Sequence, residues 1–161
     1  MTTQLSIPEN ALTLKEVQPF SALVFTTRAT LSTLSQHAPS VAENLYREAS
    51  RLNLNVTGPI QWIYTGVGGG ETNEFQLEIV LPISQPGVQS EEFSYKVFPA
   101  FRCTAYIHTG PWSDFGEVYG ALFSQLYRDG YQNDGRVREI YAVVDPENPA
   151  NCVTEIQIAL I

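Results

Sequence analysis

The sequence predicts an α+β fold in which two β-α-β-β modules are related by a pseudo-two-fold axis. Signals for strand, helix, strand and strand occur in that order twice along the 161 residues. The two copies also match in detail, because Ile60-Gln61-Trp62-Ile63-Tyr64 aligns with Val137-Arg138-Glu139-Ile140-Tyr141 at an offset of 77 residues. At the same offset, Leu77-Glu78-Ile79 aligns with Thr154-Glu155-Ile156. Two such modules predict one antiparallel sheet with helices on one side and a groove on the other.

The first module is expected over residues 16–83, after a short leader of residues 1–15. Side chains that favour strands follow Pro19 and predict a strand over residues 16–27, and a polar connection follows it over residues 28–38. The remaining elements of this module are a helix over residues 39–52 and strands over residues 60–65 and 75–83. The glycine-rich loop between these strands, Gly66 to Gly70, lacks the Gly-Lys-Ser/Thr of a phosphate loop and leads into a strand, which favours a hairpin connection.

Each module contains one helix with an apolar side. In the first module, Pro39 suits the first helical position. An apolar stripe at helical spacing follows it and consists of Val41, Leu45, Ala49 and Leu52. In the second module, Ser113 is the expected N-cap and Asp129-Gly130 ends the helix. The apolar side of this second helix consists of Phe115, Val118, Tyr119, Leu122 and Leu126.

The second module is expected over residues 93–161. Residues 93–108 predict a strand that is interrupted near Pro99, which stands at a strand start corresponding to that of Pro19. Alternating β-branched and aromatic residues then predict a strand over residues 137–141. A final strand over residues 153–161 completes the single domain.

The composition excludes several classes of function. Nine basic and seventeen acidic residues give a net charge of −8, which disfavours binding to a phosphate backbone and favours cationic partners. The N-terminal residues show no signal peptide and no apolar run has membrane-spanning length, so we expect a cytoplasmic protein without direct nucleic-acid or membrane binding. Cys103 and Cys152 have no CxxC spacing, and we expect them to be free and buried, without a zinc site.

The strand Val137–Tyr141 is the most informative stretch for function. Alternate side chains of a strand share a face, so Glu139 lies between Val137 and Tyr141 on one face. A carboxylate among apolar side chains is unfavourable unless a cation or hydrogen bonds satisfy it. Taken alone, the pattern also fits a solvated glutamate on the open face of an antiparallel sheet. The duplication favours a functional interpretation, because it sets Trp62 against Glu139 and Tyr64 against Tyr141 across the axis.

Aromatic residues are expected to gather around Glu139 on the open face of the sheet, opposite a helix-covered side that carries Thr154, Ile156 and Ile158. Aromatic walls with a carboxylate suit a cation with apolar bulk, because each ring adds cation–π attraction of roughly 0.5–2 kcal/mol. The alternative is that these aromatics are ordinary core residues. The residues expected on the open face are Trp62, Tyr64, Tyr106, Tyr141, Glu139, Glu155 and His108.

With these residues in place, the chain resembles the gyrase-inhibitor-like (GyrI-like) family, the effector-binding domain of AraC-type and multidrug-sensing transcription regulators. The resemblance covers residues 16–161 and rests on the duplicated layout and three short motifs. The motifs are His108-Thr109-Gly110-Pro111-Trp112, Arg138-Glu139-Ile140-Tyr141 and Thr154-Glu155-Ile156-Gln157-Ile158. The closing strand departs from the family pattern Ile-Pro-Val, since it reads Ile158-Ala159-Leu160. No helix-turn-helix fits before residue 16, so a stand-alone effector-binding domain is expected.

The resemblance implies a hydrophobic cleft between the two modules in which a buried glutamate pairs with cationic lipophilic drugs. Glu139 stands at the position of that glutamate, and Glu155 is expected nearby. The implied ligand-binding residues are Glu139, Tyr141, Trp62, Tyr64, Tyr106, Glu155, Trp112 and Phe115.

Three functions remain open from the sequence. The first is the binding, without catalysis or a cofactor, of cationic amphipathic aromatic compounds with Glu139 as counter-ion. The second is hydrolysis of reactive electrophiles, as in family members that act on cyclopropane-bearing toxins, with Glu139 as general acid or base. The third is protein–protein inhibition of the gyrase-inhibitor type. No metal site is indicated, His108 lacks a second ligand for haem, and a homodimer or a separate protein partner remains open.

Overall fold

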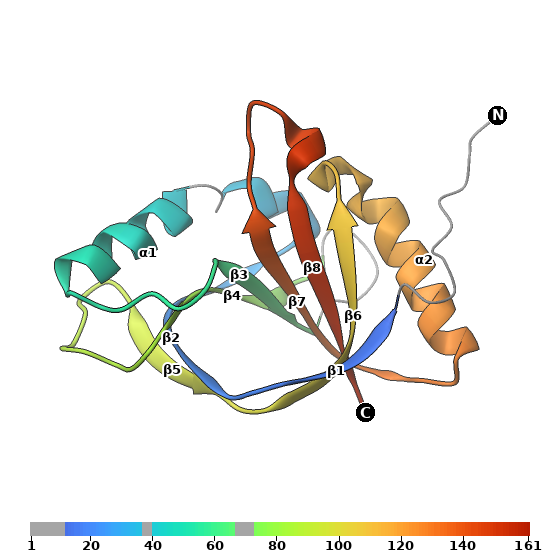
Figure 1. Cartoon of the computed structure of the whole chain (residues 1–161), viewed down its shortest axis with the longest axis horizontal. Helices are drawn as coiled ribbons and strands as arrows, with labels where there is room; N and C mark the ends of the chain where they lie inside the picture. The colour runs from blue at the N-terminus through green and yellow to red at the C-terminus, as the bar shows by residue number, and fades with distance from the viewer. Residues whose placement is uncertain (1–11, 37–39, 67–72) are drawn as a thin grey trace.

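The computed structural model describes residues 12–36, 40–66 and 73–161. In these residues, eight strands form one antiparallel sheet in the order β1-β6-β8-β7-β3-β4-β2-β5 (Figure 1). The strands are β1 (Thr13–Val17), β2 (Phe20–Ala29), β3 (Gln61–Thr65), β4 (Phe75–Ile83), β5 (Ser94–Phe98), β6 (Phe101–Thr109), β7 (Asn133–Val143) and β8 (Val153–Leu160). The helices are α1 (Ser40–Arg51) and α2 (Phe115–Arg128), with short 3-10 helices η1 (Leu31–Gln36), η2 (Trp112–Asp114) and η3 (Pro149–Asn151). The expected α+β fold with an antiparallel sheet is confirmed.

The strand order is symmetric about the central pair β3–β7. Moving outward from this pair, β4 corresponds to β8, β2 to β6, and β5 to β1. Trp62 stands directly opposite Glu139 in the β3–β7 ladder, as the offset between the modules predicts. Tyr64 pairs with Val137 and not with Tyr141, because a two-fold axis between Trp62 and Glu139 moves equivalent residues to opposite ends of the central pair.

Each half begins with an additional strand, so the repeated module is β-β-α-β-β. Pro19 and Pro99 each follow a strand and precede the next one, because proline cannot donate to a ladder and its ring fixes φ. The single strand expected over residues 16–27 is therefore wrong, since β1 ends at Val17 and β2 starts at Phe20. The leader expected to end at residue 15 also overlaps β1, which pairs with β6.

The two segments bent at these prolines pair with each other on both sides of the bend. β1 pairs with β6 and places Val17 opposite Phe101, while β2 pairs with β5 and places Phe20 opposite Phe98. This crossing brings three phenylalanines, Phe20, Phe98 and Phe101, around the guanidinium of Arg138. The bent segments therefore cover the part of β7 where Arg138 lies.

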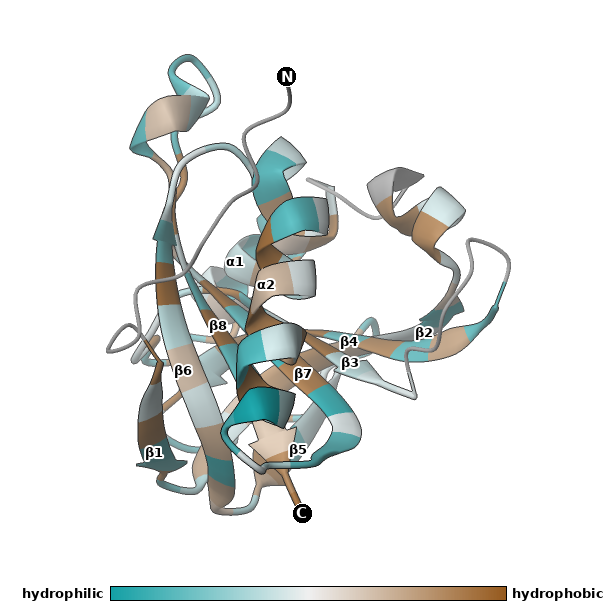
Figure 2. Ribbon diagram, turned by 90° about the vertical axis from the view of Figure 1, so that its right-hand side faces the viewer, coloured by the Kyte–Doolittle hydropathy of each residue, from teal (hydrophilic) through white to brown (hydrophobic). Residues whose placement is uncertain are grey.

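The two helices bury equivalent positions. Leu45 and Ala49 of α1 correspond to Leu122 and Leu126 of α2 at the offset of the modules, and all four are buried. Figure 2 shows polar and apolar residues alternating along α2, as expected for a helix with one buried side. Among the described residues, neither α1 nor α2 nor any shorter helix combines the length and the apolar character that a membrane-spanning helix needs.

Several local expectations need correction. The residue before α2 that acts as N-cap is Asp114, without a side-chain capping bond, because Ser113 belongs to η2. The polar connection expected over residues 28–38 contains the end of β2 and η1. Pro39 and the glycine-rich loop beyond Gly66 lie outside the described residues. Cys103 and Cys152 are free and buried, as expected.

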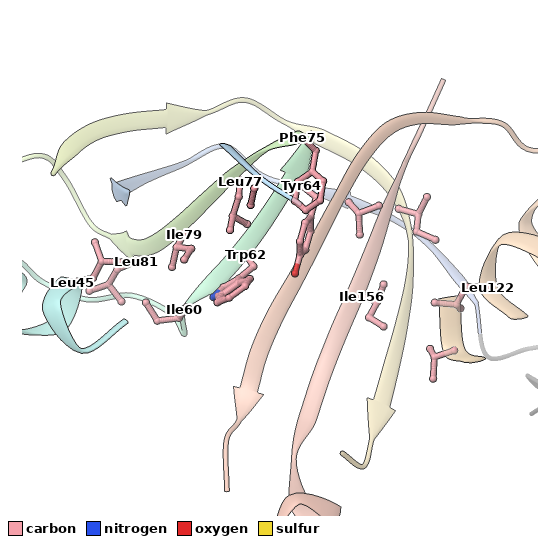
Figure 3. Close-up of a cluster of buried hydrophobic side chains, with 14 of the residues drawn as sticks. Leu45, Ile60, Trp62, Tyr64, Phe75, Leu77, Ile79, Leu81, Leu122 and Ile156 are labelled. Atoms are coloured by element: carbon pink, nitrogen blue, oxygen red, sulfur yellow. The ribbon is translucent and has the colours of Figure 1, made fainter. Parts of the chain in front are cut away.

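The helices and the residues around Glu139 lie on the same face of the sheet. One core cluster joins Leu45 of α1 and Leu122 of α2 to Trp62, Tyr64 and Ile156 (Figure 3). The prediction that the helices and the aromatic residues occupy opposite faces is therefore wrong. Glu139 pairs with Ile156, and directly paired residues of an antiparallel ladder point to the same side. Alternation along each strand, read separately, does not reveal this pairing.

Candidate functional site

Glu139 lies at the centre of the sheet, next to the symmetry axis. On the helix-covered face, one row of paired residues crosses the sheet through Tyr106, Ile156, Glu139, Trp62 and Ile79. Glu139 is 4% exposed, Trp62 is 9% exposed and Ile156 is 1% exposed. A carboxylate is thus enclosed by apolar side chains at the point where the two modules meet.

Three tyrosine hydroxyls donate hydrogen bonds to the Glu139 carboxylate. The hydroxyl of Tyr64 donates to Oε1 at 2.8 Å, and that of Tyr141 donates to the same oxygen at 2.5 Å. Tyr119, which comes from α2, donates to Oε2. Tyr64 and Tyr141 are equivalent residues of the two modules, so the duplication supplies two of the three donors. The carboxylate is therefore satisfied by hydrogen bonds although Glu139 is buried.

Aromatic rings surround this cluster and cover it on the outside. The ring of Trp62 lies 6.4 Å from that of Tyr64 and 6.1 Å from that of Tyr141. Trp112, on η2, lies 5.4 Å from Tyr141 at a steep angle and is 44% exposed. Phe115 lies 6.0 Å from Tyr119 at the start of α2. Trp112 is therefore the most exposed of the rings around Glu139.

The structure brings together most of the residues that the sequence predicted for a ligand site. Tyr106 is half-buried and packs against the same core as Trp62, two strands away from Glu139. Tyr119 was not among the predicted ligand-binding residues, although its position on the apolar side of the helix was expected. The residues that gather on this face are Glu139, Tyr141, Trp62, Tyr64, Tyr106, Trp112 and Phe115, and their role in ligand binding stays a prediction.

Glu155 does not join this group, because it points to the opposite face. Its neighbour Ile156 lies in the row of Glu139, so Glu155 turns away and pairs with Lys15 of β1 at 2.8 Å. The equivalent glutamate of the first module, Glu78, pairs with Lys96 of β5 at 2.9 Å. One ion pair links β1 to β8 and the other links β5 to β4, so the two pairs are related by the pseudo-two-fold symmetry. The sequence expectation that Glu155 lies near Glu139 on one face is wrong.

The turn before α2 places Trp112 over Tyr141. Gly110 in this turn has φ of +143°, a conformation that favours glycine, and a Cβ there would lie 3.1 Å from atoms of both His108 and Asp114. His108 is buried against Phe115, with 5.7 Å between the rings. The His-x-Gly-Pro-aromatic motif therefore has a structural explanation, because it fixes the turn that carries the outermost aromatic residue of the site.

Burial controls the electrostatics of the cluster. Loss of hydration raises the pKa of Glu139 above its ordinary value of 4.5, and the hydrogen bonds from Tyr119, Tyr141 and Tyr64 offset only part of this effect. Burial, together with the nearby carboxylate, raises the pKa values of all three tyrosines well above 10. The hydroxyls therefore keep their protons over the whole physiological range and remain donors.

The raised pKa of Glu139 predicts a pH-dependent difference in stability between the wild type and Glu139→Gln. The native state binds a proton at Glu139 more strongly than the unfolded state, so ionisation lowers the stability of the wild type as the pH rises above 4.5. Each pKa unit of the shift contributes about 1.4 kcal/mol at pH values above both pKa values. Urea unfolding of both proteins should show Glu139→Gln gaining relative stability with rising pH. A difference that is constant between pH 4 and pH 8 would contradict the assignment.

Solved structures with the same fold include a protein in complex with DNA, a protein bound to tetraphenylphosphonium and a hydrolase. The C-terminal domain of EcmrR matches with a TM-score of 0.78 and 20% identity over 93% of this chain and 96% of that chain. In the EcmrR–DNA complex the match covers 92% of this chain but 56% of the EcmrR chain, with a TM-score of 0.76 and 19% identity. SAV2435 bound to tetraphenylphosphonium matches at 0.63 with 11% identity over 93% of both chains. A hydrolase from Listeria innocua matches at 0.67 with 16% identity over 96% and 94%.

These similarities establish the fold, and a family comparison establishes the class. No curated protein sequence matches the chain. The class of the domain comes from a family model. The GyrI-like small molecule binding domain matches residues 11–161, nearly the whole chain, and this protein belongs to that family.

Proposed function

We propose that the domain binds a lipophilic monocation, with Glu139 as the counter-ion and the surrounding rings as the walls of the site. The observation that supports this most strongly is the isolation of Glu139. In the part of the chain that the structure describes, no lysine, arginine or histidine forms an ion pair with it. A buried carboxylate without a cationic partner is unfavourable, and a bound cation would provide the missing charge.

The symmetry of the fold supports a single positive charge on the ligand. The residue equivalent to Glu139 in the first module is Trp62, so the axis carries one carboxylate and one indole. The rings of Trp62 and Trp112 both contact that of Tyr141, whose hydroxyl binds the carboxylate, and the faces of such rings attract cations electrostatically. A ligand with one delocalised charge and aromatic substituents uses both features.

Ligand entry requires a local rearrangement, because the carboxylate is covered. Trp112 is the most exposed ring of the cluster, at 44%, and lies on the short η2 segment. A rotation of the Trp112 side chain would open a path to Glu139 while Trp62, Tyr64 and Tyr141 keep their positions. The tetraphenylphosphonium bound to SAV2435, a protein with this fold, is a lipophilic monocation and supports the proposal for the ligand class.

The direct test uses two ions of the same shape and opposite charge. Tetraphenylphosphonium should quench the fluorescence of Trp62 and Trp112, the two tryptophans of the chain, with saturable micromolar affinity. Tetraphenylborate, which has the same four phenyl groups and a negative charge, should bind at least about tenfold more weakly, because Glu139 repels it. Equal affinity for both ions would refute a charge-selective site.

Hydrolysis is the second candidate function, and the electrostatics of Glu139 favour it. A carboxyl with a raised pKa beside tyrosine hydroxyls can act as a general acid or base. The fold is shared with a hydrolase from Listeria innocua. Incubation with strained cyclopropane electrophiles, followed by mass spectrometry, would detect a product with one added water. Product formation that disappears in Glu139→Gln would favour this function over binding alone.

A further inference from the structure

We propose that the three tyrosines make the site selective among cations, so that it prefers permanently charged cations without N–H donors to protonated amines. The inference rests on the proposed function and concerns the same carboxylate. An ionised carboxylate offers about four lone-pair positions to hydrogen-bond donors. The hydroxyls of Tyr64, Tyr119 and Tyr141 occupy three of them.

Such a carboxylate stabilises a buried primary ammonium group poorly. The ammonium group carries three N–H donors and gives up its hydration shell when it is buried, so each donor needs an acceptor in the site. Glu139 has about one lone pair left for it, and the aromatic rings accept hydrogen bonds only weakly. A quaternary ammonium or phosphonium has no N–H donor and needs only the charge of Glu139 and the apolar surface of the rings.

Packing and protonation hold the tyrosine hydroxyls in this role. Tyr64 contacts Phe75 with 5.7 Å between the rings, and Tyr119 is flanked on α2 by Phe115 and Phe123 at 6.0 and 6.2 Å. Tyr141 lies between the two tryptophans. Because the three hydroxyls also stay protonated at neutral pH, they compete with an incoming N–H donor for the same oxygens.

The test compares ligands that differ only in their N–H donors. Biphenylmethyl-ammonium and biphenylmethyl-trimethylammonium share one scaffold and one positive charge at pH 7. Their affinity ratio is measured by tryptophan quenching in the wild type and in Tyr141→Phe. The added methyl area contributes equally in both proteins, so a change in the ratio isolates hydrogen bonding. In Tyr141→Phe a lone pair is vacated, and the preference for the trimethylated ligand should fall about tenfold.

Control variants separate this inference from the proposed function. Tyr46→Phe, at an exposed position of α1, should leave the ratio unchanged, and Tyr64→Phe should repeat the effect of Tyr141→Phe. Thermal melts verify that each variant is folded. If both ligands bind through Glu139 and the ratio is the same in all variants, the tyrosines do not set selectivity and the inference is wrong. If neither cation binds the wild type, the proposed function itself is wrong.

Discussion

Glu139→Gln should lower the affinity for tetraphenylphosphonium at least about 100-fold at pH 7. A cation bound beside a neutral amide would lie in a buried site without a counter-charge, and loss of one partner of a buried ion pair costs about 3–5 kcal/mol. Each 1.4 kcal/mol is a factor of ten in affinity, so a 100-fold loss is a conservative expectation. Triphenylphosphine oxide, a neutral analogue, should bind both proteins with similar affinity. A loss below about fivefold for the cation would mean that Glu139 is not its counter-ion.

The matched control is Glu155→Gln, which removes the other glutamate that the sequence placed near the site. Glu155 lies on the opposite face of the sheet and pairs with Lys15. Its replacement should leave the affinity for the cation within about twofold of the wild type, because the sheet separates it from the ligand. A large effect of Glu155→Gln would contradict the face assignment given by the pairing of Glu139 with Ile156.

The affinity for a permanent cation should also depend on pH through Glu139 alone. Since the pKa of this carboxyl is raised above 4.5, affinity should decrease as the pH falls through the raised value, where the site loses its negative charge. The charge of tetraphenylphosphonium does not change with pH. Affinity in Glu139→Gln should be independent of pH over the same range. This control distinguishes titration of Glu139 from other effects of low pH on the protein.

The sequence predicted the symmetry of the fold and the residue at its centre. An offset of 77 residues is visible in short matched segments, and it implied that Trp62 and Glu139 meet at the axis, as they do in the β3–β7 ladder. Residue patterns and turn signals also located both helices and the two strands that follow each of them, but they merged β1 with β2. These properties are local or follow from comparing the two halves of the sequence, so their prediction needed no information about the tertiary structure.

The sequence could not predict which face of the sheet carries the site. Alternation shows which residues share a face with Glu139 on β7 and which share a face with Ile156 on β8. Only the register between the two strands shows that Glu139 and Ile156 point to the same face of the sheet. The hydrogen bond from Tyr119 to Glu139 was missed for a related reason. On the helix, Tyr119 fits an apolar stripe at 3.6-residue spacing, and nothing local indicates that its hydroxyl reaches a carboxylate on a distant strand.

Arg138→Ala should lower the free energy of unfolding by about 3 kcal/mol. Arg138 lies on the face opposite Glu139, is 2% exposed and stacks on Phe101 at 3.7 Å, with Phe20 and Phe98 at 5.6 Å. Truncation to alanine removes these contacts and leaves a cavity where the two bent segments cross. Urea unfolding measures the loss, and cation binding should be unchanged because the sheet separates Arg138 from the site.

Arg138→Met distinguishes the packing of this side chain from its charge. The Nε and Nη1 atoms have no hydrogen-bond partner among the described residues, and burial lowers the pKa of the guanidinium to about 10, with Arg136 acting in the same direction. Methionine keeps most of the contact with the three rings and removes both the cation–π attraction and the unfavourable burial of the charge, two effects of opposite sign. Its stability should therefore lie within about 1 kcal/mol of the wild type. If Arg138→Met lowered the free energy of unfolding as much as Arg138→Ala, the charge of Arg138, and not its packing against the three phenylalanines, would hold the crossing segments together.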